Sequence, residues 1–76
     1  MSRLTPVSYS KITRVLERAG FVLVRQRGDH MIFTKPGILR PVVVPRYDPL
    51  PVFIIKNILR TGRISRDRYF ELLEKT

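Results

Sequence analysis

The only histidine of the chain, His30, directly follows the dipeptide Gly28-Asp29, and Arg25 and Arg27 lead into that dipeptide. Histidine can take up or release a proton near neutral pH, and arginine binds phosphate oxygens through a planar pair of N–H donors. Cleavage of RNA uses both abilities. A base removes the proton of the ribose 2′-hydroxyl, an acid protonates the leaving 5′-oxygen, and cations neutralise the charge growing on the phosphoryl group. These residues have the chemistry that a small ribonuclease site needs, with His30 as the proton-transfer group, although composition and pattern alone indicate only a small basic RNA-binding domain.

Each feature of this stretch also has an explanation in which no residue takes part in catalysis. A single histidine on a strand is more often a bystander than a catalyst, and Gly-Asp is sufficiently explained as a turn. Arg25 and Arg27 can be solvated charges on an edge strand, where they discourage aggregation through strand pairing. From the residues alone, two other classes stay open: a non-catalytic small basic RNA-binding domain, and a structural subunit that docks on an acidic protein.

The charge balance favours a nucleic-acid partner. Among 76 residues, 15 are basic and 6 are acidic, which gives a net charge of +9, and eleven of the basic residues are arginine. This excess of basic over acidic residues is larger than a soluble surface requires, and it is typical of proteins that bind nucleic acid. The basic residues do not form one cationic helix face, so a membrane surface is not expected as a partner.

Composition also limits cofactors and location. The chain has no cysteine, so disulfides and thiolate metal sites are excluded, and one histidine with six scattered acids does not make a zinc site. No metal or other cofactor is expected. There is no apolar run long enough to cross a bilayer and no signal-peptide pattern, so we expect a cytoplasmic protein.

Hydrophobic periodicity and turn residues predict three helices and three strands in the order α-β-β-β-α-α. Ser8 is the predicted N-cap of the first helix and Gly20 its left-handed C-cap. Gly62 is predicted to end the second helix, and Ser65 to cap the third. The expected elements are helix Tyr9–Ala19, strand Phe21–Arg27, strand His30–Lys35, strand Arg40–Val44, helix Val52–Thr61 and helix Arg66–Glu74. A three-stranded antiparallel sheet with the helices on one face, an α+β fold, buries these apolar stripes most economically.

A two-residue turn at Gly28-Asp29 also predicts the register of the hairpin. Arg27 then lies opposite His30 and Arg25 opposite Ile32, and directly paired residues point to the same face. The register therefore places Arg25, Arg27 and His30 together. The opposite face, assigned to the core, receives Val22, Val24, Met31 and Phe33.

The chain resembles the HicA family of toxin ribonucleases, also called YcfA-like proteins. The resemblance covers about Ser8 to Leu73, and Ile58-Leu59-Arg60 and the tail from Ser65 contribute to it. Its most specific part is the order of helix, Ala-Gly-Phe, strand and Gly-x-His, followed by a Val-Pro-Arg run. The three runs that carry it are Leu16-Glu17-Arg18-Ala19-Gly20-Phe21, Val24-Arg25-Gln26-Arg27-Gly28-Asp29-His30 and Val44-Pro45-Arg46.

The resemblance implies a fold like that of a double-stranded-RNA-binding domain. It also implies that residues 1–76 form a single HicA-like mRNA interferase domain, a metal-independent endoribonuclease toxin that cleaves single-stranded mRNA. The implied protein partner is a HicB-type antitoxin that masks the active site, and an acidic partner would suit a charge of +9. We expect a monomer when free and a hetero-oligomer with the antitoxin.

The catalytic histidine of the family belongs to a Gly-Ser-His motif that corresponds here to Gly28-Asp29-His30, so the resemblance implies that His30 is catalytic. Asp29 departs from the motif, and its carboxylate would repel RNA beside the scissile phosphate. Met31 stands where many members have a second histidine, and it cannot transfer a proton. The residues expected to bind RNA are Arg25, Arg27, Gly28, Lys35 and Arg46.

Overall fold

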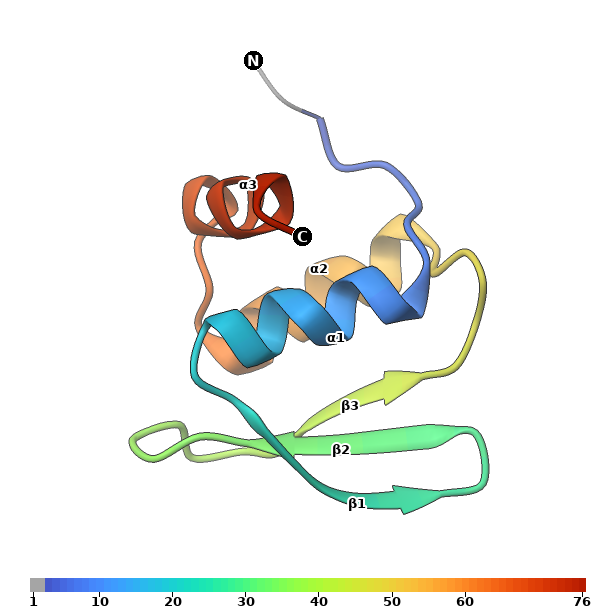
Figure 1. The fold of residues 1–76 in the computed structure, drawn as a ribbon, viewed down its shortest axis with the longest axis vertical. Helices are drawn as coiled ribbons and strands as arrows, with labels where there is room; N and C mark the ends of the chain where they lie inside the picture. Colours follow the sequence, from blue (N-terminus) through green and yellow to red (C-terminus); the bar gives the residue numbers. More distant parts are fainter. Residues whose placement is uncertain (1–2) are drawn as a thin grey trace.

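The computed structural model describes residues 3–76, which form a three-stranded antiparallel sheet and three helices (Figure 1). The strand order β1-β2-β3 follows the chain, and the helices lie on one face of the sheet. The predicted α+β fold class and the α-β-β-β-α-α order are confirmed. The elements are α1 Tyr9–Arg18, β1 Val22–Arg27, β2 His30–Thr34, β3 Val42–Pro45, α2 Val52–Gly62 and α3 Arg66–Glu74.

Both ends of α1 are set by local hydrogen bonds, as predicted. The Ser8 hydroxyl accepts a bond from the Ser10 N–H at the start of the helix. At the other end, Gly20 adopts a φ of +99°. Its N–H bonds to the Glu17 carbonyl, and the next N–H, that of Phe21, bonds to the Leu16 carbonyl at 2.9 Å. This pair of bonds is a Schellman motif, and it turns the chain directly into β1.

The register of the β1–β2 hairpin is confirmed at its turn end, where Arg27 pairs with His30 and Arg25 with Ile32. Further along, the register shifts, and Leu23 pairs with Phe33, so that Val24 is an extra residue in a β-bulge. The bulge changes which side chains of β1 share a face with those of β2.

The prediction that Val22 and Val24 face the core is wrong, because they are 60% and 56% exposed. The bulge is one reason. The other is that β1 is the edge strand, whereas α1 and α2 pack on β3 at the opposite edge. Met31 and Phe33 do face the helices as predicted: Phe33 is fully buried, and Met31 packs against the core.

The third strand is shifted from its predicted bounds, since pairing begins at Val42 and includes Pro45. Val42 and Val44 are buried under the helices, but Val43 is 45% exposed on the other face. The run of three valines therefore alternates, as expected of a strand covered on one face only.

The end of α2 differs from the prediction. The helix runs one residue further than expected: Gly62 is its last helical residue and not the cap, and Arg63 follows as the left-handed cap with a φ of +55°. A Cβ on Gly62 would lie 3.1 Å from Cζ of Phe21 and 3.4 Å from Cγ2 of Val42. The glycine is therefore needed for close packing of the helix on the sheet, and not for a turn.

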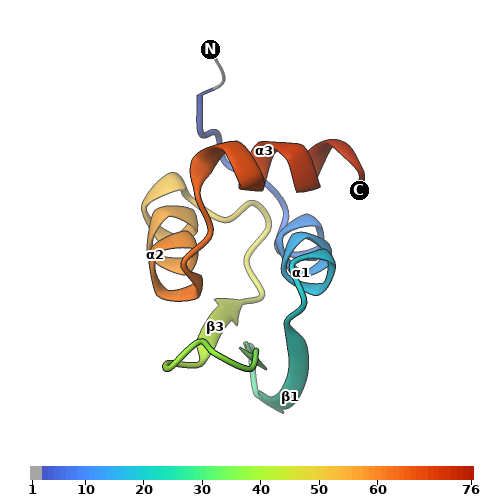
Figure 2. The ribbon, with the colours of Figure 1, turned by 90° about the vertical axis from the view of Figure 1, so that its left-hand side faces the viewer.

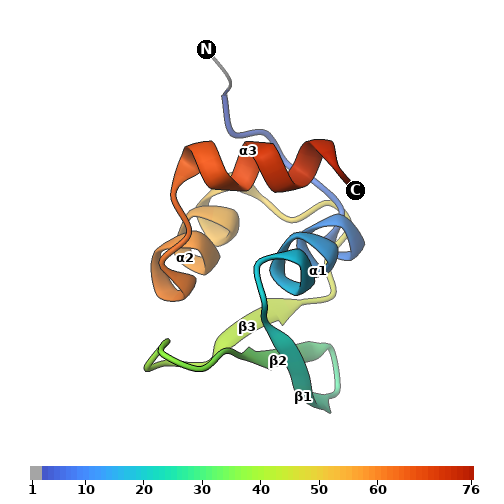
Figure 3. The same cartoon turned by 60° about the vertical axis from the view of Figure 1, so that its left-hand side comes forward.

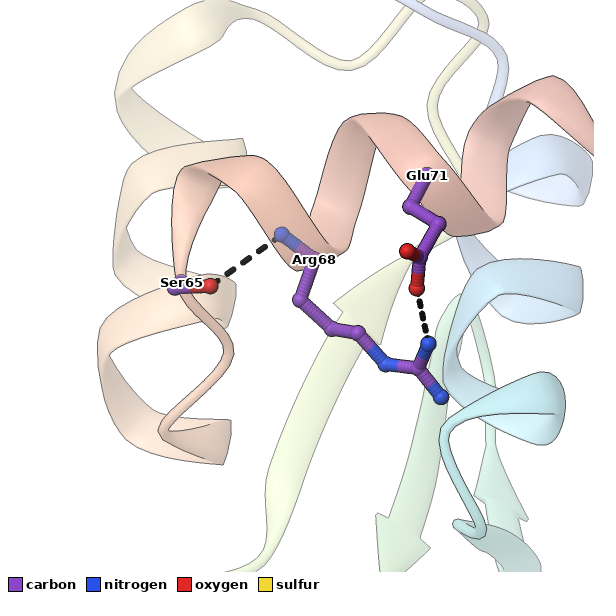
Figure 4. Close-up of polar contacts among 3 residues, drawn as sticks. All are labelled: Ser65, Arg68 and Glu71. Carbon is purple, nitrogen blue, oxygen red and sulfur yellow. Dashed lines mark hydrogen bonds and ion pairs between the residues drawn. The ribbon is translucent and has the colours of Figure 1, made fainter.

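Helix α3 lies across α1 and α2 on the side away from the sheet (Figure 2). The Ser65 hydroxyl caps it by accepting a bond from the Arg68 N–H, as predicted, and the Arg68 side chain forms an ion pair with Glu71 (Figure 4). Tyr69 and Leu72 are its buried residues. With them the core comprises Ile12, Val15, Leu16, Phe21, Phe33, Val42, Val44, Leu50, Ile55, Ile58, Leu59, Tyr69 and Leu72.

Candidate active site

His30 is the first residue of the central strand, and its side chain is exposed. It pairs with Arg27 of β1 on one side and with Pro45 of β3 on the other. The backbone of His30 is therefore held from both sides. Because Met31 and Phe33 face the helices, His30 faces the opposite, open side of the sheet. In Figure 1 this end of the sheet carries the β1–β2 turn.

The turn itself is accessible from outside. Gly28 has a φ of +56°, which a residue with a side chain rarely adopts. Apart from the two residues next to it in the chain, no heavy atom lies within 4 Å of the position that a Cβ on Gly28 would occupy. The primed turn predicted from Gly-Asp is thus observed, and an anion can approach the Gly28 backbone without meeting a side chain at this point.

The paired register brings two arginines to the same face as His30. Arg27 is directly opposite His30, a position at which Cβ atoms are about 4.5–5.5 Å apart. Arg25 pairs with Ile32, two rows further along, and is a diagonal neighbour of His30 at about 7–8 Å. Both arginine side chains are exposed. Their guanidinium groups can reach a phosphate group that lies against the imidazole.

Arg46 is tied to this end of the sheet through its backbone, and its side chain packs against Tyr9 of α1. Its N–H donates to the Asp29 carbonyl at 2.7 Å, which ties the loop after β3 to the turn. Its guanidinium lies 5.4 Å from the ring centre of Tyr9, and Nη2 donates to the Tyr9 hydroxyl at 3.3 Å. That hydrogen bond raises the pKa of Arg46 above its ordinary value. Arg46 is thus a permanently charged group that Tyr9 holds beside the turn.

Lys35 is not brought to His30. It follows β2, five residues after His30, which places it about 16 Å away along the strand. Its ammonium group lies 5.7 Å from the ring centre of Phe21, and its side chain covers Gly20. Of the residues predicted to bind RNA, Arg25, Arg27 and Gly28 therefore gather around His30, Arg46 is adjacent, and Lys35 lies at the other end of the sheet.

Two contributors to this site were not predicted. Tyr9 is 37 residues from Arg46 in the sequence, and its role as a support becomes visible only in the fold. Val43 lies in the same row as Arg25 and Ile32 and adds an exposed apolar side chain to the open face. The alternation of the valine run in β3 was the signal that could have identified it.

Within residues 3–76, no group of three or more His, Cys, Asp or Glu side chains is arranged to hold a metal ion. Over the same residues, none of the helices has the length and apolar character needed to cross a membrane.

The fold and the site define a small basic α+β domain that presents an imidazole beside two arginines on the open face of its sheet. The family model of the HicA toxin of bacterial toxin–antitoxin systems matches residues 9–64. The chain therefore belongs to the HicA toxin family, whose members are generally ribonuclease toxins and function in systems that pair a toxin with an antitoxin. No curated protein matches the sequence.

Proposed function

We propose that this protein is a metal-independent endoribonuclease toxin that cleaves single-stranded mRNA, with His30 as the general acid–base. The observation that carries the proposal is the row in which Arg27 and His30 are directly paired on the open face of the sheet. This row unites a group that can transfer a proton near neutral pH with a group that binds phosphate. Membership of the HicA family supports the same reaction class.

In the proposed reaction, neutral His30 takes the proton from a ribose 2′-hydroxyl, and the 2′-oxygen attacks the adjacent phosphorus. The bond from phosphorus to the 5′-oxygen breaks, and that oxygen takes up a proton. The products are a 2′,3′-cyclic phosphate and a 5′-hydroxyl. Arg27 and Arg25 bind the non-bridging oxygens and stabilise the charge that develops on them. Since the chain has no second histidine, we propose that water carries the second proton.

Asp29 and Met31 bear on the rate of this reaction. A carboxylate next to the imidazole repels the phosphate chain. Met31 cannot contribute a proton, and it pairs with Gln26 and Val44 and packs against the core. We therefore expect slower turnover than two histidines would give.

The proposed protein partner is an acidic antitoxin of the HicB type. Its physical basis is the net charge of +9 and the open sheet face, where a partner would cover His30 and the arginines together. We propose that residues 1–76 act in the cytoplasm as one mRNA interferase domain, monomeric when free and hetero-oligomeric when inhibited.

The decisive experiment compares the protein with its His30→Ala variant on single-stranded RNA in excess chelator. We expect cleavage to fall by about 10²–10⁴-fold, the usual contribution of positioned proton transfer, with RNA affinity nearly unchanged. Lys75→Ala, which removes an exposed charge just after α3, is the matched control and should cleave at the parent rate. If His30→Ala cleaves RNA as fast as the parent, the catalytic assignment is wrong.

A non-catalytic RNA-binding module is the second candidate, and the carboxylate of Asp29 beside the histidine is the observation that favours it. Such a protein would retain RNA, with an affinity that decreases steeply as salt rises, and would leave the RNA intact. Detection of 2′,3′-cyclic phosphate ends that depend on His30 decides against this candidate.

A further inference from the structure

A second cluster of arginines surrounds a hollow at the end of the sheet opposite His30. The hollow has a volume of about 330 Å³ and is lined by Leu39, Arg40, Asn57, Arg60, Thr61 and Arg63. These residues come from the β2–β3 loop and from the C-terminal end of α2. Figures 2 and 3 show that the loop passes below this end of the helix.

The chemistry of the lining suits an anion. Three of the six residues that line the hollow are arginines, and none is acidic. Within residues 3–76, neither Arg40, Arg60 nor Arg63 forms an ion pair. Arg60 donates through Nη2 to Oδ1 of Asn57 at 3.4 Å, which leaves the amide N–H groups of Asn57 available as donors. The C-terminus of α2 contributes only about half a negative charge, far less than three guanidinium groups.

The backbone of Arg63 gives a second, independent reason to assign a function to this cluster. Its φ of +55° is the left-handed conformation that glycine adopts freely and other residues adopt with strain. Glycine is the usual residue at this position of a helix end. A large charged side chain stands here instead, and it lines the hollow. Such strain points to a side chain that is kept for its interactions.

We propose that this hollow binds the phosphate backbone of an RNA strand at a point several nucleotides from the linkage that lies at His30. The inference rests on the proposed function and adds a second RNA contact beside α2, at the end of the sheet away from His30. Arg40 precedes β3, and Pro45 at the end of β3 pairs with His30, so the two sites are about 16 Å apart along this strand. A ligand that reaches both ends must be long and must carry charge throughout its length, as single-stranded RNA does.

The test uses the full chain with His30→Ala, so that RNA stays intact, and a labelled single-stranded RNA of about 16 nucleotides. Arg40→Gln/Arg60→Gln removes two charges from the hollow and leaves the strained Arg63 untouched. The matched control, Arg66→Gln/Lys75→Gln, removes two exposed charges, one at the start of α3 and one just after its end. Binding is measured by fluorescence anisotropy over a range of salt concentrations.

Two lost phosphate contacts should reduce the slope of log K against log salt by about 1.4, which corresponds to about 25-fold weaker binding near 0.1 M salt. The α3 control should keep the parent slope. If both double variants bind RNA with the same affinity and slope, the proposal is overturned. It is also overturned if Arg40→Gln/Arg60→Gln loses binding to a polyglutamate peptide but not to RNA, because the hollow would then be a site for an acidic protein.

The same double variant with His30 intact separates this inference from the proposed function. We expect its KM for a long RNA to rise and its kcat to stay at the parent value, since the hollow is distant from the reacting atoms. Persistent cleavage by His30→Ala would remove the catalytic proposal. The inference about the hollow would then be tested by the same binding comparison on RNA that carries 2′-O-methyl groups, which cannot be cleaved by attack of a 2′-hydroxyl.

Discussion

Replacing Arg63 with glycine should make the protein more stable, although it removes an arginine. Arg63 is exposed, and its φ is +55°. In this conformation the Cβ of a non-glycine residue crowds the following carbonyl oxygen. Glycine has no Cβ, and it is the residue that helix ends of this kind usually carry.

The size of the effect follows from two opposing contributions. Relief of the left-handed strain stabilises the folded chain by about 1–2 kcal/mol. The greater freedom of glycine in the unfolded chain offsets about 0.5–1 kcal/mol of this. The net gain is about 1 kcal/mol, which for a domain of this size raises Tm by about 4–8 °C.

Thermal and urea unfolding, followed by circular dichroism, measure this change, and an unaltered urea m-value would show that both states are otherwise the same. Arg60→Gly is the matched control. It makes the same substitution inside α2, where glycine should destabilise by about 1 kcal/mol. The reasoning about strain is refuted if Arg63→Gly leaves Tm unchanged or lowers it. The variant should at the same time bind RNA more weakly, so stability and binding should change in opposite directions.

Two further predictions concern tyrosines. Burial raises the pKa of Tyr69 above its ordinary value of 10.0. Above that pH the unfolded chain loses the phenol proton before the folded chain does, so the free energy of unfolding should fall as pH rises. Tyr69→Phe should show a smaller fall in urea titrations at alkaline pH, and an equal fall would contradict the assignment. Tyr9→Ala removes the ring and hydroxyl that hold Arg46 and should raise the KM for RNA about two- to fivefold. Tyr9→Phe keeps the ring and should recover most of that loss; a parent-like KM in Tyr9→Ala would show that Arg46 needs no support.

The features predicted correctly from sequence are those determined by neighbouring residues. Ser8 and Gly20 delimit α1 through bonds that span at most five residues. The Gly28-Asp29 turn determines the first rows of the hairpin, and through them the placement of Arg27 opposite His30. The central part of the candidate site was therefore predictable, because it lies within a single hairpin.

The bulge at Val24 was not predictable by the same reasoning. Val22, Leu23 and Val24 are all apolar residues suited to strands, so no difference among them marks the extra residue. The helices also cover β3 and leave β1 as a free edge, and this arrangement depends on the packing of the whole chain. Alternation of side chains within β1 alone could not reveal which face would be buried.

Gly62 shows how a local rule can fail because of a distant contact. A glycine near the end of a helical pattern usually marks its C-cap, but Gly62 is required by Phe21, which is 41 residues earlier in the chain. The arginine-lined hollow has the same origin. Arg40 and Arg60 are 20 residues apart, and only the packing of the β2–β3 loop against α2 brings them together.

The third helix lies beyond the stretch that the family model matches, which ends at residue 64. Yet Tyr69 and Leu72 belong to the same core as Phe33 and Leu16, and α3 packs directly on α1. Removing the helix would expose the apolar faces of α1 and α2 that point away from the sheet. It would also remove Tyr69 and Leu72 from a core that is already small. The shortest segment that carries the family signature is therefore not the shortest segment that can fold, and proteolysis or truncation before Ser65 should abolish activity through unfolding, with His30 and its arginines still in the chain.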